Sequence, residues 1–284
     1  MHRLIHQFTI NRLSPPAAPD DRDILAHDRH SAYFLGLLAQ RDTSLQKRGM
    51  AKALTEIQTE WRHIQQAWEW VAGRGDVERL QRTANALARY LSLRGRYQTG
   101  ERLFGQAAEA LRAPFGASDA ASGGAGLVSA LVRGQLLLSQ ARFLNLQAEH
   151  ERLAVVAQAA RAQFEHTLAQ ARAEGIRELA VASLSNLGSI AMLQSDYAAA
   201  RDSLEAALQL HEQMDEPLVA ASLLSDLGVV MMLYGDYAAA RSYLERSQQT
   251  CQQNGDRAGE GMACFNLGRV TDTIGRYDAA QSYF

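Results

Sequence analysis

Apolar residues recur at helical spacing along most of the chain, and one unit shows the pattern clearly. Leu224, Leu227 and Met231 fall on one face of a first helix, because positions three and four apart lie on the same side. Gly235 ends that helix, since glycine takes the left-handed conformation without steric strain, and Asp236 then caps a second helix. The apolar stripe of the second helix is Tyr237, Ala240 and Leu244. The pattern predicts a helical hairpin.

This hairpin recurs with a period of 40 residues. The columns that keep the spacing are Asn186, Asp226 and Asn266; Gly188, Gly228 and Gly268; Tyr197, Tyr237 and Tyr277; and Phe164, Leu204, Leu244 and Phe284. Gly228 and Ala240 are small where the two antiparallel helices must approach each other. Because a lone hairpin would leave one apolar face in water, consecutive hairpins are predicted to stack.

These repeated residues resemble the tetratricopeptide repeat. Residues 176–284 follow the family pattern, which is a large apolar residue, then Leu-Gly, then Gly-x-Tyr, then alternating small and large residues. Ser195 replaces the turn glycine in one copy. The last copy stops inside its second helix at Phe284. The period exceeds the usual ~34 residues, which implies longer helices. The resemblance implies an all-α fold, a right-handed α-α superhelix with an N-terminal helical block.

Two earlier segments are predicted to form less regular hairpins. Residues 76–112 look like a degenerate repeat in which Gly100 takes a small-residue position. Residues 127–175 keep the register in their second helix, but their first helix lacks the Leu-Gly pair. The segment 113–126 between them is rich in Gly, Ala and Ser and is predicted to be a flexible loop, either filler or a functional insertion.

Residues 21–75 are predicted to form two helices. In the second helix, apolar residues follow one stripe that ends at Gly73, so Trp61 and Trp68 are expected in the core. Trp70 lies off this stripe. It either packs on the first repeat, which we favour, or is an exposed aromatic anchor for a partner.

Charge and composition narrow the classes of function. The 29 Lys and Arg residues are balanced by 31 Asp and Glu residues, a net charge of -2, so the basic surface of a nucleic-acid-binding protein is not expected. No run reaches the ~18 uninterrupted apolar residues of a membrane span, and the first thirteen residues lack the apolar block of a signal peptide, so a cytoplasmic protein is expected. Cys251 and Cys264 lack the spacing of a zinc or redox site and are interpreted as buried thiols.

No motif of a catalytic or cofactor site is found. The sequence lacks GxxxxGK[ST], a strand-associated GxGxxG, HExxH and GxSxG. His27 and His30 lie three apart on a predicted helix, which permits metal binding, but without a third ligand a solvated helix face is favoured. The chain is therefore predicted to bind a ligand without catalysis and without a cofactor or metal of its own.

The N-terminus resembles a second family. Residues 1–13, followed by the proline-rich linker 14–20, are similar to the end of the winged-helix domain in signal-transduction ATPases with numerous domains, the STAND proteins. In that family a histidine of a Met-His-Asp segment contacts bound ADP. The resemblance places this role on His2, although Arg3 replaces the acidic residue and an ordinary surface histidine is the alternative. The order of winged helix, helical block and helical-repeat sensor also resembles these proteins.

The tetratricopeptide resemblance also predicts where a ligand binds. In such arrays the first helices line the concave face, and residues that flank the Leu-Gly pair point into it. Asn186 and Asn266 could clamp a peptide backbone, or they could merely bond a neighbouring helix. The predicted ligand-binding residues are Ser185, Asn186, Ser189, Met192, Ser225, Asp226, Val229, Met232, Phe265, Asn266, Arg269 and Asp272.

Two functions from different classes follow. The first is the sensor of a STAND-type regulatory ATPase, which binds a protein, a peptide or a small-molecule inducer and changes its contacts with the nucleotide-binding domain of the same chain. The second is an independent tetratricopeptide scaffold that binds a protein segment in its concave face. Neither function requires nucleic-acid or membrane binding by this part of the protein.

Overall fold

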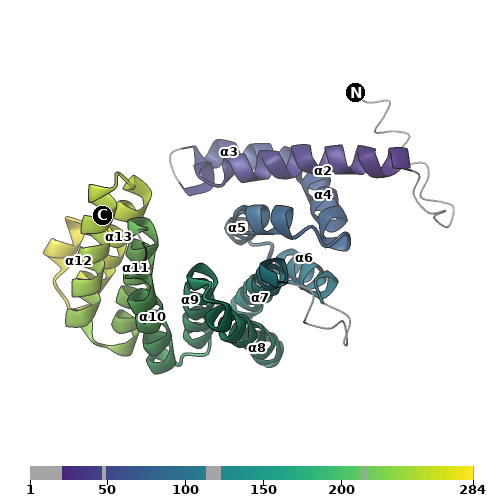
Figure 1. The fold of residues 1–284 in the computed structure, drawn as a ribbon. Helices are drawn as coiled ribbons and strands as arrows, with labels where there is room; N and C mark the ends of the chain where they lie inside the picture. Colours follow the sequence, from purple (N-terminus) through teal and green to yellow (C-terminus); the bar gives the residue numbers. More distant parts are fainter. Residues whose placement is uncertain (1–20, 47–48, 113–122, 213, 215, 284) are drawn as a thin grey trace.

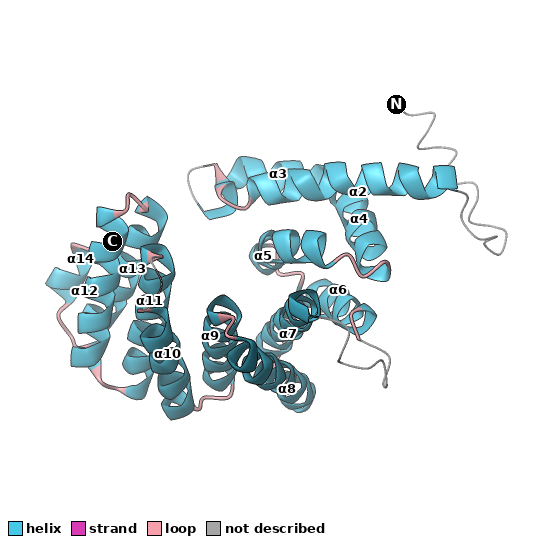
Figure 2. Ribbon diagram, in the orientation of Figure 1, coloured by secondary structure: helices cyan, strands magenta, loops and turns pink. Residues whose placement is uncertain are grey.

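The structure is a computed structural model that describes residues 21–46, 49–112, 123–212, 214 and 216–283. Within these residues the regular elements are all helical, with no strand (Figure 2), which confirms the predicted all-α class. The elements are α2 (Asp21–Arg41), the 3-10 helix η2 (Ser44–Gln46), α3 (Met50–Thr59), α4 (Trp61–Gly73), α5 (Val77–Leu93), α6 (Tyr97–Ala110), α7 (Gly123–Leu146), α8 (His150–Glu174), α9 (Arg177–Leu193), α10 (Tyr197–His211), α11 (Pro217–Tyr234), α12 (Tyr237–Gln253), α13 (Arg257–Thr273) and α14 (Tyr277–Gln281).

From α5 onward the helices form antiparallel pairs that stack in chain order (Figure 1). Each second helix, α6, α8, α10 or α12, packs on the first helix of its own pair and on the first helix of the next. First helices also touch along the stack, α5 with α7, α7 with α9 and α11 with α13, whereas α9 and α11 make little direct contact. The stack curves, with α8 and α12 on its outer side (Figure 1). This arrangement is the predicted α-α solenoid.

The two helices of a pair approach each other most closely at a glycine. A methyl group at Gly228 would lie 2.5 Å from Cγ of Leu244, and one at Gly188 would lie 2.8 Å from Cγ of Leu204. Leu204 and Leu244 are buried. A larger residue at either glycine would therefore push the helices apart, which confirms the predicted reason for the small residue.

The first helix of each pair ends at a residue in the left-handed conformation. Gly235 has a φ of 95° at the end of α11, and Ser195, which replaces the turn glycine, adopts a φ of 60°. Ala148 takes the same conformation between α7 and α8. Asp236 then caps α12 by accepting a hydrogen bond from the backbone N–H of Ala239 at 2.9 Å.

The apolar character of α11 is explained by its place in the stack. By length and composition alone, this helix could cross a membrane. In the structure it packs against α10, α12 and α13, and the Leu-Gly pair is buried. Leu224, Leu227 and Val230 contribute to this burial. A helix that is covered on several sides is expected to be apolar around most of its circumference.

The N-terminal block differs from the prediction of two helices, because its second helix is divided into α3 and α4 at Glu60. The backbone of Glu60 departs from helical geometry, with a φ of -96° and a ψ of 10°, so α3 ends before it and α4 begins after it. The hydroxyls of Thr55 and Thr59 donate to the carbonyls four residues earlier, at 2.9 Å and 3.0 Å.

Trp68 lies in the core of the N-terminal block, as predicted. It is buried, and its indole N–H donates to the backbone carbonyl of Leu103 on α6. Trp61 is only half-buried and packs against the ring of Tyr90. The stripe that contains both tryptophans therefore joins α4 to the first hairpin.

Trp70 packs as favoured, but on α2 and not on the first repeat. Its indole N–H donates to Asp28 at 2.9 Å, and its ring stacks on His27 at 4.3 Å between centroids. His30 lies 3.2 Å from His63 of α4, measured between ring nitrogens. The expectation that His27 and His30 occupy a solvated helix face is therefore wrong, because α2 turns this face against α4.

Several other expectations are corrected or fall outside the described residues. The loop predicted over residues 113–126 is too long at its C-terminal end, because α7 already begins at Gly123; residues 113–122 lie outside the described residues. Cys251 is buried as expected, whereas Cys264 is half-buried and accepts a hydrogen bond from the amide of Gln248. The predicted winged-helix tail with His2 and the linker lie outside the described residues.

The left-handed residue Ser195 generates a prediction for stability. Replacing Ser195 by glycine should raise the free energy of unfolding by up to ~1 kcal/mol, because relief of left-handed strain exceeds the added entropy of the unfolded chain. Equilibrium denaturation with urea measures the change. Ser195→Ala is the control, since alanine keeps the strain. An equal gain from alanine would show that φ does not limit stability at this turn.

The packing of His30 generates a prediction for pH. Burial lowers the pKa of His30 below its usual value of 6.5, and the nearby charges of His63 and His27 lower it further. The unfolded chain therefore takes up this proton first as pH falls, so stability should decline from pH 7 toward pH 5. His30→Gln should flatten this decline in urea denaturation, whereas the same change at exposed His166 should not. Equal flattening by both variants would contradict the prediction.

Candidate ligand-binding surface

The residues around the Leu-Gly pairs fall on two sides of the first helices. The leucine and glycine of each pair are buried, and the glycines of α9 and α11 contact the second helix of the same hairpin. Most of the flanking residues lie away from that contact and are half-buried or exposed. We call these flanking side chains, together with Arg142 of α7, the inner surface. Its members are Arg142, Ser185, Asn186, Ser189, Ser225, Asp226, Val229, Phe265, Asn266, Arg269 and Asp272.

On α9 the inner surface is polar and uncharged. Ser185, Asn186 and Ser189 are half-buried. The side-chain N–H of Asn186 donates to the backbone carbonyl of Ala182 at 2.8 Å, within its own helix. This geometry leaves the amide oxygen of Asn186 as an acceptor. Met192 is half-buried and packs on the core cluster of α9–α11, so it contributes more to packing than predicted.

On α11 the predicted residues divide between surface and core. Ser225, Asp226 and Val229 are half-buried members of the inner surface. Met232 is buried instead, in an apolar cluster with Leu267 of α13. Its predicted role as a ligand contact is therefore wrong, because the next first helix covers this side of α11.

On α13 the inner surface combines an aromatic ring, charges and a buried amide. Phe265 is 49% exposed, and Arg269 and Asp272 are exposed. Asn266 is only 5% exposed, yet its side-chain amide has no hydrogen-bond partner in the described part of the chain. Its amide atoms still reach solvent, because the one fully buried side-chain N or O atom without a partner among the described residues is Nδ1 of His211.

Two opposite charges of the inner surface act on each other across an intervening hairpin. Burial raises the pKa of the Asp226 carboxyl to about 6, while the positive charge of Arg142 opposes this shift. Burial also lowers the pKa of Arg142, although its side chain is open to water.

Neither of these charges is neutralised by a protein partner. Among the described residues, the side chains of Arg142 and Asp226 form no ion pair or hydrogen bond with each other or with another residue. Arg89 of α5 precedes the start of α6 by the same number of residues as Arg142 precedes the start of α8. It does have such a partner, because its Nε lies 3.2 Å from Oδ1 of Asp42. Arg142 and Asp226 are therefore available to a charged ligand.

The sequence prediction missed Arg142. The 40-residue period does not extend to α7, because α8 has 25 residues whereas α10 has 15. The position of Arg142 can be found by aligning the hairpins at the first residues of their second helices. His150 then aligns with Tyr197, 47 residues later, and Arg142 aligns with Ser189. An alignment by helix starts would have included it.

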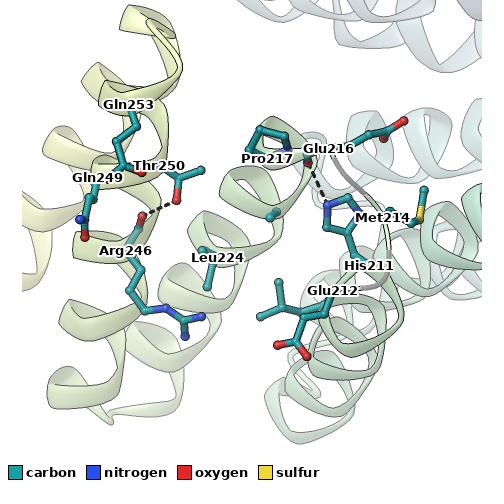
Figure 3. Close-up of a pocket in the computed structure, with 12 residues that line it drawn as sticks. His211, Glu212, Met214, Glu216, Pro217, Leu224, Arg246, Gln249, Thr250 and Gln253 are labelled. Atoms are coloured by element: carbon teal, nitrogen blue, oxygen red, sulfur yellow. Dashed lines mark hydrogen bonds between the residues drawn. The ribbon is translucent and has the colours of Figure 1, made fainter.

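A cleft of about 440 Å³ between α10 and α12 is a second candidate site (Figure 3). Glu212 and Arg246 extend toward it from opposite walls, with Leu224 of α11 behind them (Figure 3). His211 is buried, and its Nε2 donates to the carbonyl of Glu216 at 2.8 Å, since a carbonyl can only accept. Its Nδ1 is thereby left as a buried acceptor without a partner. Sequence reasoning missed this cleft, although the 40-residue register aligns His211 with the buried residues Ala171 and Cys251.

The inner surface is the stronger of the two candidates. The charged residues of the cleft, Glu212 and Arg246, are exposed, so water solvates them in the absence of a ligand. The cleft also contains the buried, unpartnered Nδ1 of His211, whereas the inner surface offers amides and a desolvated carboxyl from several first helices. Groups that could hold a metal ion, three or more His, Cys, Asp or Glu side chains together, are not found in the described residues.

Comparison with known families agrees with this architecture over the C-terminal part of the chain. Residues 181–214 and 219–284 each match the tetratricopeptide repeat. These two segments are tetratricopeptide repeats. The match covers α9 to α14, the same hairpins in which the 40-residue period is regular. The hairpins before residue 181 belong to the same stack by structure.

Solved structures share the fold at low sequence identity. BtubC (BKLC) from P. vanneervenii is 17% identical, with 87% of each chain covered and a TM-score of 0.46. A Rap protein in complex with Competence and Sporulation Factor is 13% identical, with 90% of this chain and 75% of that chain covered and a TM-score of 0.47. A STAND protein with a tetratricopeptide repeat sensor from Pyrococcus horikoshii is 12% identical, with a TM-score of 0.51. No curated protein sequence matches the chain.

The likeness to the P. horikoshii protein covers 93% of this chain and 39% of that one. At this identity the likeness concerns the fold. It shows that the helical block and the tetratricopeptide stack together adopt an arrangement found in another protein.

The raised pKa of Asp226 generates a prediction. The folded chain binds this proton more tightly than the unfolded chain, so ionised Asp226 should reduce stability above pH 6, and the loss should disappear as pH falls toward 4. Asp226→Asn should therefore raise the free energy of unfolding at pH 7.5 by ~1–3 kcal/mol and have little effect at pH 4. Urea denaturation at the two pH values measures this difference. A gain that is the same at both would contradict the prediction.

Proposed function

We propose that the inner surface binds a segment of another protein or a peptide, and that this chain is the sensor region of a STAND-type regulatory ATPase. The observation that carries the binding role is the pair of side-chain amides at the same repeat position, Asn186 and Asn266, whose hydrogen-bonding groups are not all used within the described part of the chain. Such amides can pair with the backbone of a bound segment. The role is one of binding, without catalysis.

Peptide binding suits the chemistry of this surface. Each residue of an extended backbone offers one donor and one acceptor, and a side-chain amide pairs with both. Asn186 contributes a free acceptor, and Asn266 contributes both kinds of group. Phe265 and Val229 add apolar area beside them. A small-molecule inducer is the alternative ligand, and it would use fewer of these positions.

The sensor role rests on the order of segments along the chain. A tail similar to a winged-helix domain, a helical block and a repeat array follow one another, as in STAND proteins. The fold likeness to one such protein is compatible with this role. In the proposed mechanism, a bound ligand changes the contacts between the repeats and the nucleotide-binding domain of the same protein. A ligand that binds the active state more tightly shifts the population toward it.

The proposed binding role predicts the effect of removing the two amides. Asn186→Ala combined with Asn266→Ala should weaken binding by ~1–3 kcal/mol in total, the amount expected for partly buried hydrogen bonds, and should leave the fold intact. The probes are peptides selected on the chain from a displayed library of random dodecamers, and calorimetry gives their affinities. Gln135→Ala with Gln163→Ala is the control, because these amides lie on the same stack outside the inner surface.

Failure can take two forms. If the library yields no binding peptide, or if the double asparagine variant keeps full affinity, the inner surface is not the binding site. If the variant melts at a much lower temperature, the two asparagines serve the scaffold.

The sensor role is tested separately from binding. The coding sequence upstream of Met1 should contain a phosphate-binding loop and a winged helix. In that longer protein, replacing His2 should loosen bound ADP and raise basal activity. A stop codon directly upstream, or unchanged ADP retention, favours an independent scaffold.

A further inference from the structure

The cleft between α10 and α12 holds two opposite charges that the protein leaves unpaired. Glu212 extends into it from the end of α10 and Arg246 from α12, on opposite walls, with Leu224 of α11 behind them (Figure 3). In the part of the chain that the structure describes, neither charged group forms an ion pair or a hydrogen bond. The cavity itself therefore brings a carboxylate and a guanidinium to one site.

This pair of charges is not a by-product of the repeat. In the 40-residue register, Glu212 aligns with Arg172 and Arg246 aligns with Ala206. The preceding junction, between α8 and α10, thus carries a single positive charge at these two positions. The opposed carboxylate and guanidinium belong to the junction between α10 and α12.

The α10 wall of the cleft is also built differently from the corresponding helix ends. After α8 and α12 a backbone hydrogen bond closes the turn, from Ile176 to Ala171 at 2.8 Å and from Asp256 to Cys251 at 2.9 Å. After α10, the carbonyl of His211 accepts instead from the N–H of Met214 at 2.7 Å, and the His211 ring donates to the carbonyl of Glu216. A side chain therefore holds this turn, and all three residues line the cleft.

One atom of this wall lacks a partner. Nε2 of His211 donates to a carbonyl, so Nδ1 of the neutral ring is an acceptor, and it is buried without a hydrogen-bond partner among the described residues. Buried acceptors in native proteins nearly always have a donor. A rearrangement of the wall that gives Nδ1 a donor is therefore favourable, and a ligand that carries N–H groups can supply it.

The size and the chemistry of the cleft fit a small zwitterion. Its volume of about 440 Å³ lies within the roughly 300–1,000 Å³ of small-molecule sites. The planar guanidinium of Arg246 can bind a carboxylate through two parallel hydrogen bonds, and Glu212 can bind a protonated amine. Leu208 and Leu224 add apolar lining. A ligand with one charge alone would leave the opposite charge of the cleft unmatched.

We propose that the cleft between α10 and α12 binds a zwitterionic small molecule of the amino-acid or short-peptide class, its carboxylate held by Arg246 and its protonated amine by Glu212. The cleft shares no lining residue with the inner surface. This site is therefore a second one, independent of the peptide-binding role of the inner surface.

Probes with free and blocked ends test the class of ligand. The set comprises apolar amino acids and all di- and tripeptides of alanine and leucine, each with free ends, with an acetylated amine or with an amidated carboxyl. Calorimetry should show binding of at least one probe with free ends, and blocking either end should weaken that binding at least ~10-fold, because each block removes a charge-assisted hydrogen bond. The absence of binding by every free probe, or equal binding of the blocked forms, overturns the proposal.

Neutral variants identify the residues. Arg246→Gln should abolish the preference for a free carboxyl alone, and Glu212→Gln the preference for a free amine alone. Arg241→Gln and Glu245→Gln are the matched controls, because these exposed charges lie on α12 and do not line the cleft. The controls should keep both preferences. Circular dichroism verifies folding, and if a variant does not fold, the comparison of free and blocked probes on the unchanged protein still decides.

The remaining outcomes separate this site from the inner surface. Asn186→Ala combined with Asn266→Ala should leave the affinity for the free probe unchanged. Loss of the probe in that variant would place it on the inner surface and overturn the cleft proposal. Both preferences surviving in Arg246→Gln and Glu212→Gln would also overturn it. Failure of the dodecamer library bears on the inner surface alone.

Discussion

The rest of the structure depends on the contact between a glycine of the first helix and a leucine of the second. At Gly228 and Gly188 the two helices lie so close that a methyl group would overlap the leucine side chain. This contact fixes the rotation of the first helix about its axis. Once the Leu-Gly pair faces the second helix, the residue before the pair, Asn186 or Asp226, must turn away from it. The inner surface is thus a geometric consequence of hairpin packing, and its chemistry can vary without changing the fold.

The sequence predicted the fold best where each column of residues has one structural task. Turn residues, cross-helix glycines and core leucines repeat every 40 residues because every hairpin from α9 onward must solve the same packing problem. Ser195 shows that the turn requires a left-handed backbone and not glycine as such. The N-terminal block has no repeat to compare with. Its break at Glu60 is a local departure of the backbone from helical geometry, which helical periodicity does not reveal.

The candidate site was predicted less completely, because it depends on relations between hairpins. Repeat register placed Asn186, Asp226 and Asn266 on one surface, but it could not show that Met232 is covered by α13. It also could not show that the amide of Asn266 lacks a partner, since burial and hydrogen bonding are properties of three dimensions. The sequence prediction missed Arg142 because α8 is longer than the later second helices, which breaks the 40-residue period.

The junction between α9 and α11 suggests how binding could reach the rest of the molecule. First helices touch each other on both sides of the α9–α11 junction, but α9 and α11 themselves make little direct contact, and α10 provides most of the connection. The core is nevertheless continuous there, because buried residues of α9, α10 and α11 form one apolar cluster. A ligand that contacts first helices on both sides of the junction would add contacts to this cluster and favour one relative position of the two halves of the stack. The same ligand between two tightly packed hairpins would change little. A sensor made of stacked hairpins therefore gains most when its ligand contacts span the junction with the fewest contacts of its own.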